Sequence, residues 1–208
     1  MQPFRTLTAR AAPLDRVNVD TDQIIPKQFL KRIERTGYGD FLFFDWRQTP
    51  EGDPIPDFVL NDPRYKSAQI LVAGKNFGCG SSREHAAWAL SDFGFRCVIA
   101  PTFADIFFSN AGKNGILLVR LSEEEVETLL QNAQEIPGYQ LTVSLPDQTV
   151  ADGKGFEAKF DVDPFRKFCL LEGLDDIGLT LRHAAELDKY EAQHDNAVWL
   201  KAKLNAAA

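Results

Sequence analysis

Three short apolar runs alternate with helical patterns over residues 68–133, and this alternation limits the possible folds more than any other feature of the sequence. The runs at 69–73, 97–100 and 116–119 have the length of buried strands. Apolar residues with the spacing of one helix face occur at Ala86, Ala89, Leu90 and Phe93, and again at Val126, Leu129, Leu130 and Ala133. Because such alternation produces a parallel sheet covered by helices, the sequence predicts an α/β fold.

The last third of the chain follows a different pattern. Leu141, Val143 and Leu145 alternate with polar residues and predict a strand, and 156–162 predicts another after a turn at 146–148. Helices are predicted at 163–173 and 176–203. We therefore expect a single domain over residues 1–208, with a core at about 1–165 and a C-terminal helical extension at about 163–204.

A glycine-rich loop joins the first predicted strand to the first predicted helix. Residues 74–85 read Gly-Lys-Asn-Phe-Gly-Cys-Gly-Ser-Ser-Arg-Glu-His, and the glycines permit tight turns and close approach to a ligand. Ser81, Ser82 and Arg83 stand where a helix is expected to begin, near Ser82, and the free N–H groups of a helix start favour an anion. With Gly80, these residues predict a site for a carboxylate or an oxyanion, not for a metal.

Other known loops with serine or lysine do not fit this pattern. A Walker loop needs its lysine directly before Ser or Thr, whereas Lys75 precedes the glycines. A nucleophile elbow centred on Ser81 would need glycine where Cys79 and Arg83 stand. A serine hydrolase is disfavoured because no recognisable triad frames Ser81.

Several residues near the loop also have purely structural interpretations. Ser81-x-x-Glu84 predicts a capping box, as does Ser122-x-x-Glu125. We expect His85 to orient the loop and Cys79 to be a small packed residue. Asp20 and Asp22 could form a carboxylate pair for acid–base chemistry, but a turn or cap role is favoured.

Residues 36–66 combine Gly, Pro and Asp with an unusual number of aromatic side chains. These are Tyr38, Phe41, Phe43, Phe44, Trp46, Phe58 and Tyr65. A disordered linker would be poor in aromatic residues, so this segment is expected to pack. The sequence leaves open whether it packs on its own core or against a partner.

Charge and cysteine content exclude several classes of protein. The net charge of −7, from 30 acidic and 23 basic residues, argues against nucleic acid as the main partner. No apolar run approaches the ~20 residues of a membrane span, so no membrane partner is expected and the default location is cytoplasmic. Cys79, Cys97 and Cys169 are too widely spaced for a cluster motif, and we expect no metal on this chain alone.

Four segments in order resemble one known family. The string G-x-G-S-S-R-E-H at 78–85 is similar to the active loop in the swivelling domain of the aconitase superfamily. Residues 18–31, 111–116 and 165–181 look like further signatures of the bacterial 3-isopropylmalate dehydratase small subunits. The resemblance covers nearly the whole chain and implies a swivelling β/β/α domain of the aconitase C-terminal type with a C-terminal helical extension.

The resemblance also implies a reaction and a partner. Members of this family isomerise 2-isopropylmalate to 3-isopropylmalate in leucine biosynthesis, as a heterodimer with a large subunit that carries a [4Fe-4S] cluster. Ser81 aligns with the catalytic serine of the family, and Gly80, Ser82 and Arg83 are expected to bind substrate. The loop aligned with residues 29–32 contributes to substrate choice in relatives, which makes Lys31 and Arg32 candidate substrate contacts.

Two alternative functions remain open at this point. The chain could serve a related hydratase, of the homoaconitase or methylmalate type, which the 29–32 loop and a substrate profile would distinguish. It could also be a non-catalytic anion-binding module, which activity of the two-subunit complex would exclude.

Overall fold

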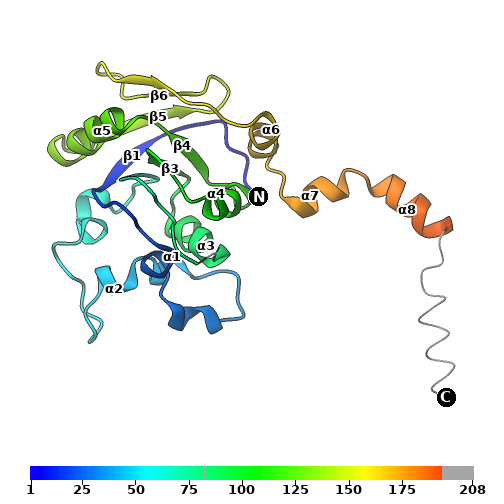
Figure 1. Cartoon of the computed structure of the whole chain (residues 1–208), viewed down its shortest axis with the longest axis horizontal. Coiled ribbons are helices and arrows are strands. Elements are labelled where there is room, and N and C mark those ends of the chain that lie inside the picture. Colours follow the sequence, from blue (N-terminus) through cyan, green and yellow to red (C-terminus); the bar gives the residue numbers. More distant parts are fainter. Residues whose placement is uncertain (82, 194–208) are drawn as a thin grey trace.

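The computed structural model describes residues 1–81 and 83–193. Its strands form one mixed sheet. Its strands lie in the order β4-β3-β2-β1-β5-β6-β7 (Figure 1). β1 to β4 are parallel to one another, and β5, β6 and β7 continue from β1 as antiparallel neighbours. The strand bounds are Thr6–Leu14 (β1), Ile70–Ala73 (β2), Cys97–Ala100 (β3), Leu117–Arg120 (β4), Gln140–Ser144 (β5), Thr149–Ala151 (β6) and Glu157–Lys159 (β7).

The predicted strands are confirmed, but the strand at the centre of the sheet was missed. β1 joins the parallel half of the sheet to the antiparallel half, pairing with β2 on one side and β5 on the other. Its sequence, Thr-Leu-Thr-Ala-Arg-Ala-Ala-Pro-Leu, contains residues with low β propensity, so its position in the sheet is fixed by long-range pairing. β6 was also missed, and β7 is shorter than the predicted strand at 156–162.

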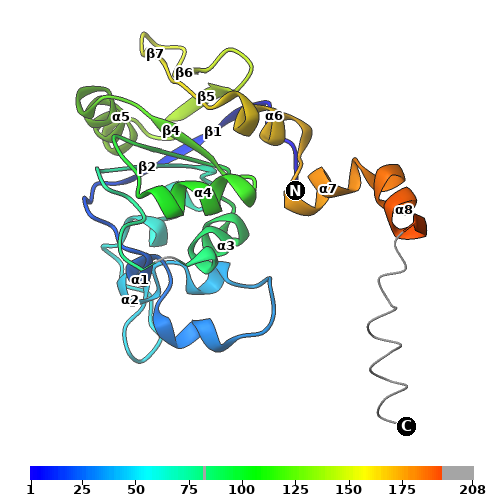
Figure 2. The ribbon, with the colours of Figure 1, turned by 45° about the vertical axis from the view of Figure 1, so that its right-hand side comes forward.

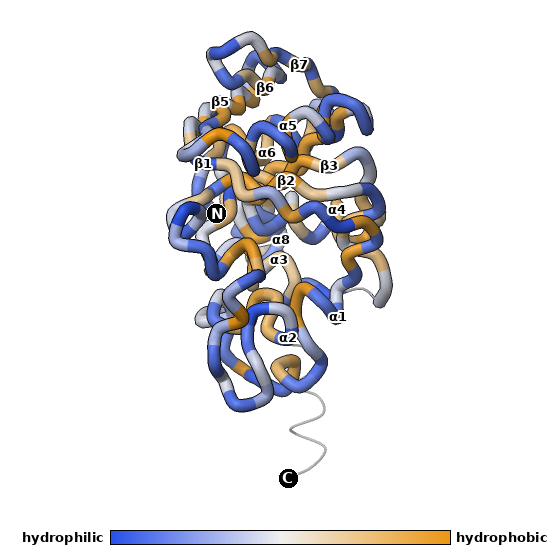
Figure 3. Tube along the Cα trace, turned by 90° about the vertical axis from the view of Figure 1, so that its left-hand side faces the viewer, coloured by the Kyte–Doolittle hydropathy of each residue, from blue (hydrophilic) through white to orange (hydrophobic). Residues whose placement is uncertain are grey.

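Helices cover both faces of the sheet, and alternate residues of each strand serve the two faces. Leu71 and Ala73 of β2 belong to the core beneath α3 (Glu84–Phe93) and α4 (Asp105–Lys113). Ile70 and Val72 point to the other core, which α5 (Glu123–Glu135) covers. In Figure 3 the orange of hydrophobic residues marks strands β2 and β3, and the outer segments on either side of them are more hydrophilic.

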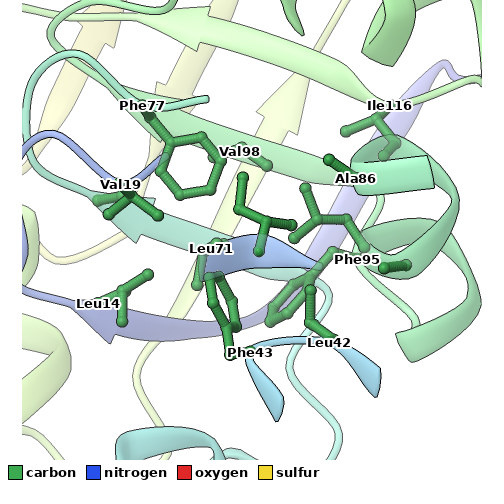
Figure 4. Packing of buried hydrophobic residues seen from close by; sticks show 14 of the residues in the cluster. Leu14, Val19, Leu42, Phe43, Leu71, Phe77, Ala86, Phe95, Val98 and Ile116 are labelled. Atoms are coloured by element: carbon green, nitrogen blue, oxygen red, sulfur yellow. The ribbon is translucent and has the colours of Figure 1, made fainter. Parts of the chain in front are cut away.

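The aromatic segment 36–66 packs on the domain's own core. It forms short helices at Gly39–Phe41 (η2), Phe44–Arg47 (α2), Val59–Asn61 (η3) and Pro63–Tyr65 (η4). Tyr38 and Phe43 have 0% exposed surface, and Phe58 and Tyr65 are also buried. Figure 4 shows Phe43 in the same cluster as Leu71 of the sheet. Of the two interpretations left open, burial within the domain is confirmed for these four rings.

The C-terminal helical extension is present, but its predicted long helix is broken. α6 (Pro164–Glu172) matches the prediction, whereas residues 176–193 form two helices, α7 (Asp176–Leu181) and α8 (Ala184–Gln193). The break lies at Arg182 and His183, whose N–H groups bond three residues back, to Leu179 and Thr180. Such tight bonds end a helix turn. Residues 194–203 of the predicted helix lie outside the described residues, and the division at about residue 165 stays a prediction.

Candidate active site

The glycine-rich loop lies at the carboxyl end of β2, as the strand–helix pattern predicted. It runs beside the segment that follows β1. The N–H of Asn18 donates to the Lys75 carbonyl at 2.9 Å, and the N–H of Gly78 donates to the Val19 carbonyl at 2.7 Å. Two short segments far apart in sequence are thereby held together where ligands gather in parallel sheets.

The glycines serve packing within the protein as well as flexibility. Gly78 has φ +77°, and a Cβ built there would lie 2.2 Å from the ring of Phe107. Gly80 has φ +85°, and its Cβ would lie 3.3 Å from that of Asp20. Any side chain at 78 would therefore displace α4 from the loop, whereas Gly80 combines a left-handed backbone with an exposed position.

Ser81 does not cap the helix that follows it, so the capping box predicted for Ser81 and Glu84 is wrong. α3 begins at Glu84, and Arg83 occupies the cap position without a side-chain bond to the helix. The Ser81 carbonyl accepts a hydrogen bond from the Thr21 hydroxyl, which ties the loop to the first residue of α1 (Thr21–Ile24). Ser81 is exposed. The second predicted box, at Ser122 and Glu125, is confirmed.

Arg83 is nearly buried and forms an ion pair with Asp22. Its side chain is 10% exposed, and its Nη1 atom contacts the Oδ1 atom of Asp22. The other carboxylate oxygen of Asp22 lies 3.5 Å from Lys27 Nζ. The prediction of a cap role is confirmed for Asp20, whose carboxylate accepts a bond from the Gln23 N–H at 2.8 Å.

For Asp22, in contrast, the sequence interpretation missed the ion pair. Residues 22 and 83 are far apart in the chain, and no local pattern connects them. Their contact arises only because the segment after β1 lies against the loop after β2.

A polar bridge from α4 fixes the first turn of α3, and it was also missed. Asn114 donates from Nδ2 to Glu84 Oε1 at 3.1 Å and accepts from Trp88 Nε1 at 3.0 Å. The Glu84 side chain therefore bonds to Asn114 and not to the Ser81 N–H, as the predicted capping box would require. Asn114 belongs to the 111–116 segment that the sequence analysis singled out.

His85 lies between two aromatic rings. Its ring centroid is 5.3 Å from that of Tyr38 and 4.6 Å from that of Trp88. Burial lowers the pKa of His85, against the opposing charge of Glu84 and with a smaller contribution from the Arg83 charge. This shift favours the neutral imidazole, which fits packing of the loop; its orienting role stays a prediction.

The candidate specificity residues lie at the end of a short 3₁₀ helix, η1 (Lys27–Lys31). Lys31 is exposed. The guanidinium of Arg32 lies 5.8 Å from the ring centroid of Tyr38 and 5.0 Å from that of Phe41. Since Tyr38 also contacts His85, the structure brings Arg32 toward the beginning of α3.

Ser82 lies outside the described residues, and the cysteines do not gather. Cys79 is half-buried, and burial, together with a smaller contribution from the nearby charge of Asp20, raises the pKa of its thiol.

Within 1–81 and 83–193, no three His, Cys, Asp or Glu side chains form a group that could hold a metal ion. None of the helices in these ranges is long and apolar enough to span a membrane.

Fold and loop together define a swivelling domain of the aconitase type. The sequence profile of the aconitase C-terminal domain matches residues 1–124, more than half of the chain. A solved structure of 3-isopropylmalate dehydratase from Methanocaldococcus jannaschii superposes with a TM-score of 0.65, covering 88% of this chain and 99% of that one. At 24% identity this likeness supports the fold, and the predicted fold class is confirmed.

Closer relatives define the family. Two further profiles match, one described as LeuD_N at 127–164 and one for the C-terminal domain of the 3-isopropylmalate dehydratase small subunit at 176–202. The 3-isopropylmalate dehydratase small subunit of Acidobacterium capsulatum is 69% identical over 208 residues, covering 100% of this chain and 98% of its own. The counterpart from Brevibacillus brevis is 60% identical over 193 residues, covering 93% and 100%. The chain belongs to the family of 3-isopropylmalate dehydratase small subunits.

Proposed function

We propose that this chain is the small subunit of a hydro-lyase that converts 2-isopropylmalate to 3-isopropylmalate in leucine biosynthesis, in the cytoplasm. The observation that carries the proposal is the loop at 78–85. It presents an exposed Ser81 next to a nearly buried arginine, in a family whose relatives carry this enzyme's name. The name "small subunit" implies a large-subunit partner, with which the chain is proposed to form a heterodimer.

The isomerisation divides into two chemical tasks. A hydroxide must leave, and a proton must be removed from the carbon next to a carboxylate. Hydroxide is a poor leaving group, and a [4Fe-4S] cluster on the large subunit is proposed to supply the Lewis acid that it needs. The tasks left to this chain are to bind the substrate carboxylate and to remove the proton.

Ser81 is proposed as the base that removes the carbon-bound proton. A serine hydroxyl is too weak an acid to be ionised at neutral pH, so it needs surroundings that stabilise the alkoxide. The positive charge of Arg83, the amino end of α3 and the backbone N–H of Gly80 are the candidates near it. Because Ser81 takes no part in capping, its hydroxyl is not committed to holding the helix.

Arg83 is proposed to bind a substrate carboxylate while Asp22 holds its side chain in place. A guanidinium has five N–H donors, so the pair with Asp22 through Nη1 leaves other donors for the substrate. Ser82, outside the described residues, and Gly80 are proposed to bind the substrate as well. Lys31 and Arg32 are proposed to contribute to substrate choice.

Arg83→Lys is expected to raise KM for the substrate about 10- to 100-fold and to lower kcat less. Lysine keeps the charge but loses the planar fork that binds a carboxylate with two bonds. Arg35→Lys is the matched control, because Arg35 is not among the proposed site residues. Its guanidinium lies over the Trp88 ring, 5.2 Å from the ring centroid. Steady-state kinetics of both variants in the assembled complex checks this, and an unchanged KM for Arg83→Lys would contradict the carboxylate-binding role.

A substrate profile of the reconstituted complex tests the proposed function. We expect the highest kcat/KM for 2-isopropylmalate, and lower values for shorter or longer relatives by about 10-fold or more per methylene group. Preference for homoaconitate or a methylmalate would favour the related hydratases. A fully loaded complex that binds these acids but turns over none of them would favour a non-catalytic anion-binding module.

A further inference from the structure

The two C-terminal helices present apolar side chains to solvent. Ile177 is 66% exposed and Leu181 is 63% exposed, and because they are four residues apart in α7 they lie on the same helix face. Leu187 in α8 is 40% exposed. Figures 1 and 2 show both helices extending away from the sheet. Large apolar side chains exposed together are typical of a surface that a partner covers.

The beginning of α7 is bonded to other elements of the domain. Lys113 Nζ at the end of α4 lies 2.7 Å from Asp176 Oδ2 in the first turn of α7. The amino terminus at Met1 donates a hydrogen bond to the Gly173 carbonyl at 3.0 Å. These contacts tie the beginning of α7 to the end of α4 and to the amino terminus.

A pocket connects α7 with the helix that follows the proposed active loop. The pocket has a volume of about 310 Å³, and its lining includes Asp176 and Ile177 together with Glu84 and Trp88. Glu84 directly follows Arg83. The pocket thus joins the first turn of α3, which directly follows the loop, to Ile177 of α7, and a partner that covers both the loop and this pocket also meets α7.

The size of a stable interface favours the large subunit as the occupant. A specific interface covers about 800 Å² on each partner, and its centre is usually apolar. The loop around Gly80 and Ser81 is small and polar, so it does not provide such a centre by itself. The interface can extend from the pocket onto α7, where Ile177 and Leu181 supply apolar surface, and on to Leu187 of α8.

The charge of this region disfavours a second copy of the same chain. Residues 175–191 contain five carboxylates against two cations. Pairing of two identical arms would bring like charges together, which costs free energy. A partner with an apolar patch edged by Lys or Arg fits this surface better.

We propose that α7 and α8 form a docking arm for the large subunit, with Ile177, Leu181 and Leu187 as its apolar contacts. This inference rests on the proposed function, because the continuity argument starts from a loop that the large subunit must reach. It adds a specific prediction, namely that contacts remote from the catalytic serine determine the affinity between the two subunits.

The test compares matched glutamate substitutions in the full-length chain. Ile177→Glu and Leu187→Glu should raise the Kd for the large subunit by at least about 10-fold. Ala185→Glu is the control: Ala185 is exposed and two residues from Leu187, so it faces the opposite side of α8. It introduces the same charge, and its Kd should change less than about 2-fold. At saturating large subunit all three variants should keep the wild-type kcat.

Two outcomes would overturn the docking arm. One is an unchanged Kd for Ile177→Glu and Leu187→Glu, measured by calorimetry on variants whose circular dichroism matches the wild type. The other is a wild-type homodimer that Leu187→Glu dissociates without changing the Kd for the large subunit. Turnover of 2-isopropylmalate by the wild-type pair is measured in the same preparations, so failure of the proposed function would be seen separately.

Discussion

Ser81→Ala is expected to lower kcat of the assembled complex by about 10²- to 10⁴-fold or more, because it removes the proposed base. The substitution deletes one oxygen from an exposed residue that does not cap α3. We therefore expect the free energy of unfolding to change by less than about 0.5 kcal/mol. Steady-state kinetics and chemical denaturation of the same preparation measure the two effects.

Ser122→Ala provides the opposite control. Ser122 caps α5 through its bond to the Glu125 N–H, and it lies outside the proposed active loop. Loss of this cap should cost about 1 kcal/mol of stability and leave kcat unchanged. If both variants lost stability and activity in proportion, the effect of Ser81→Ala would reflect folding, not chemistry.

The second large effect concerns the division of labour between the subunits. The purified chain alone is expected to show no detectable turnover, because the proposed Lewis acid for hydroxide departure belongs to the large subunit. Anaerobic addition of a large subunit with its cluster should restore activity with a one-to-one stoichiometry. Iron and sulfide analysis is the independent measurement, and a stoichiometric cluster on this chain alone would contradict the proposal.

The fold was largely predictable where local patterns decide the structure. Short apolar runs and helical spacing were sufficient for β2, β3 and α3, because the two strands are buried along their whole length and α3 is buried along one face. β1 was not predictable in this way. Its alanines and Pro13 carry little strand preference, and its pairing with β2 and β5 comes from partners distant in the sequence.

The candidate site shows the same division between local and long-range information. The glycines, serines and arginine of the loop are contiguous, so their chemistry could be read directly. The ion pair of Arg83 with Asp22 and the bridge from Asn114 to Glu84 each connect segments that the fold brings together. The capping prediction for Ser81 failed because α3 starts at Glu84, two residues later than expected, so that Arg83 and not Ser81 occupies the cap position.

Aromatic content alone could not distinguish a core from an interface in residues 36–66. Tyr38 and Phe43 are fully buried, so removal of this segment would open the domain's own core. α7 and α8, where the sequence predicted only a helix, instead carry exposed apolar residues, among them Ile177 and Leu181. Burial depends on the neighbours that a segment meets, and these are visible only in the folded chain.

Exchange of the substrate's carbon-bound proton with solvent deuterium, measured in the assembled complex, is the most direct test that this chain supplies the base. The wild-type complex should exchange the proton, and the Ser81→Ala complex should exchange it at least about 10²-fold more slowly while still binding substrate. Exchange at the wild-type rate in Ser81→Ala would show that the base lies elsewhere.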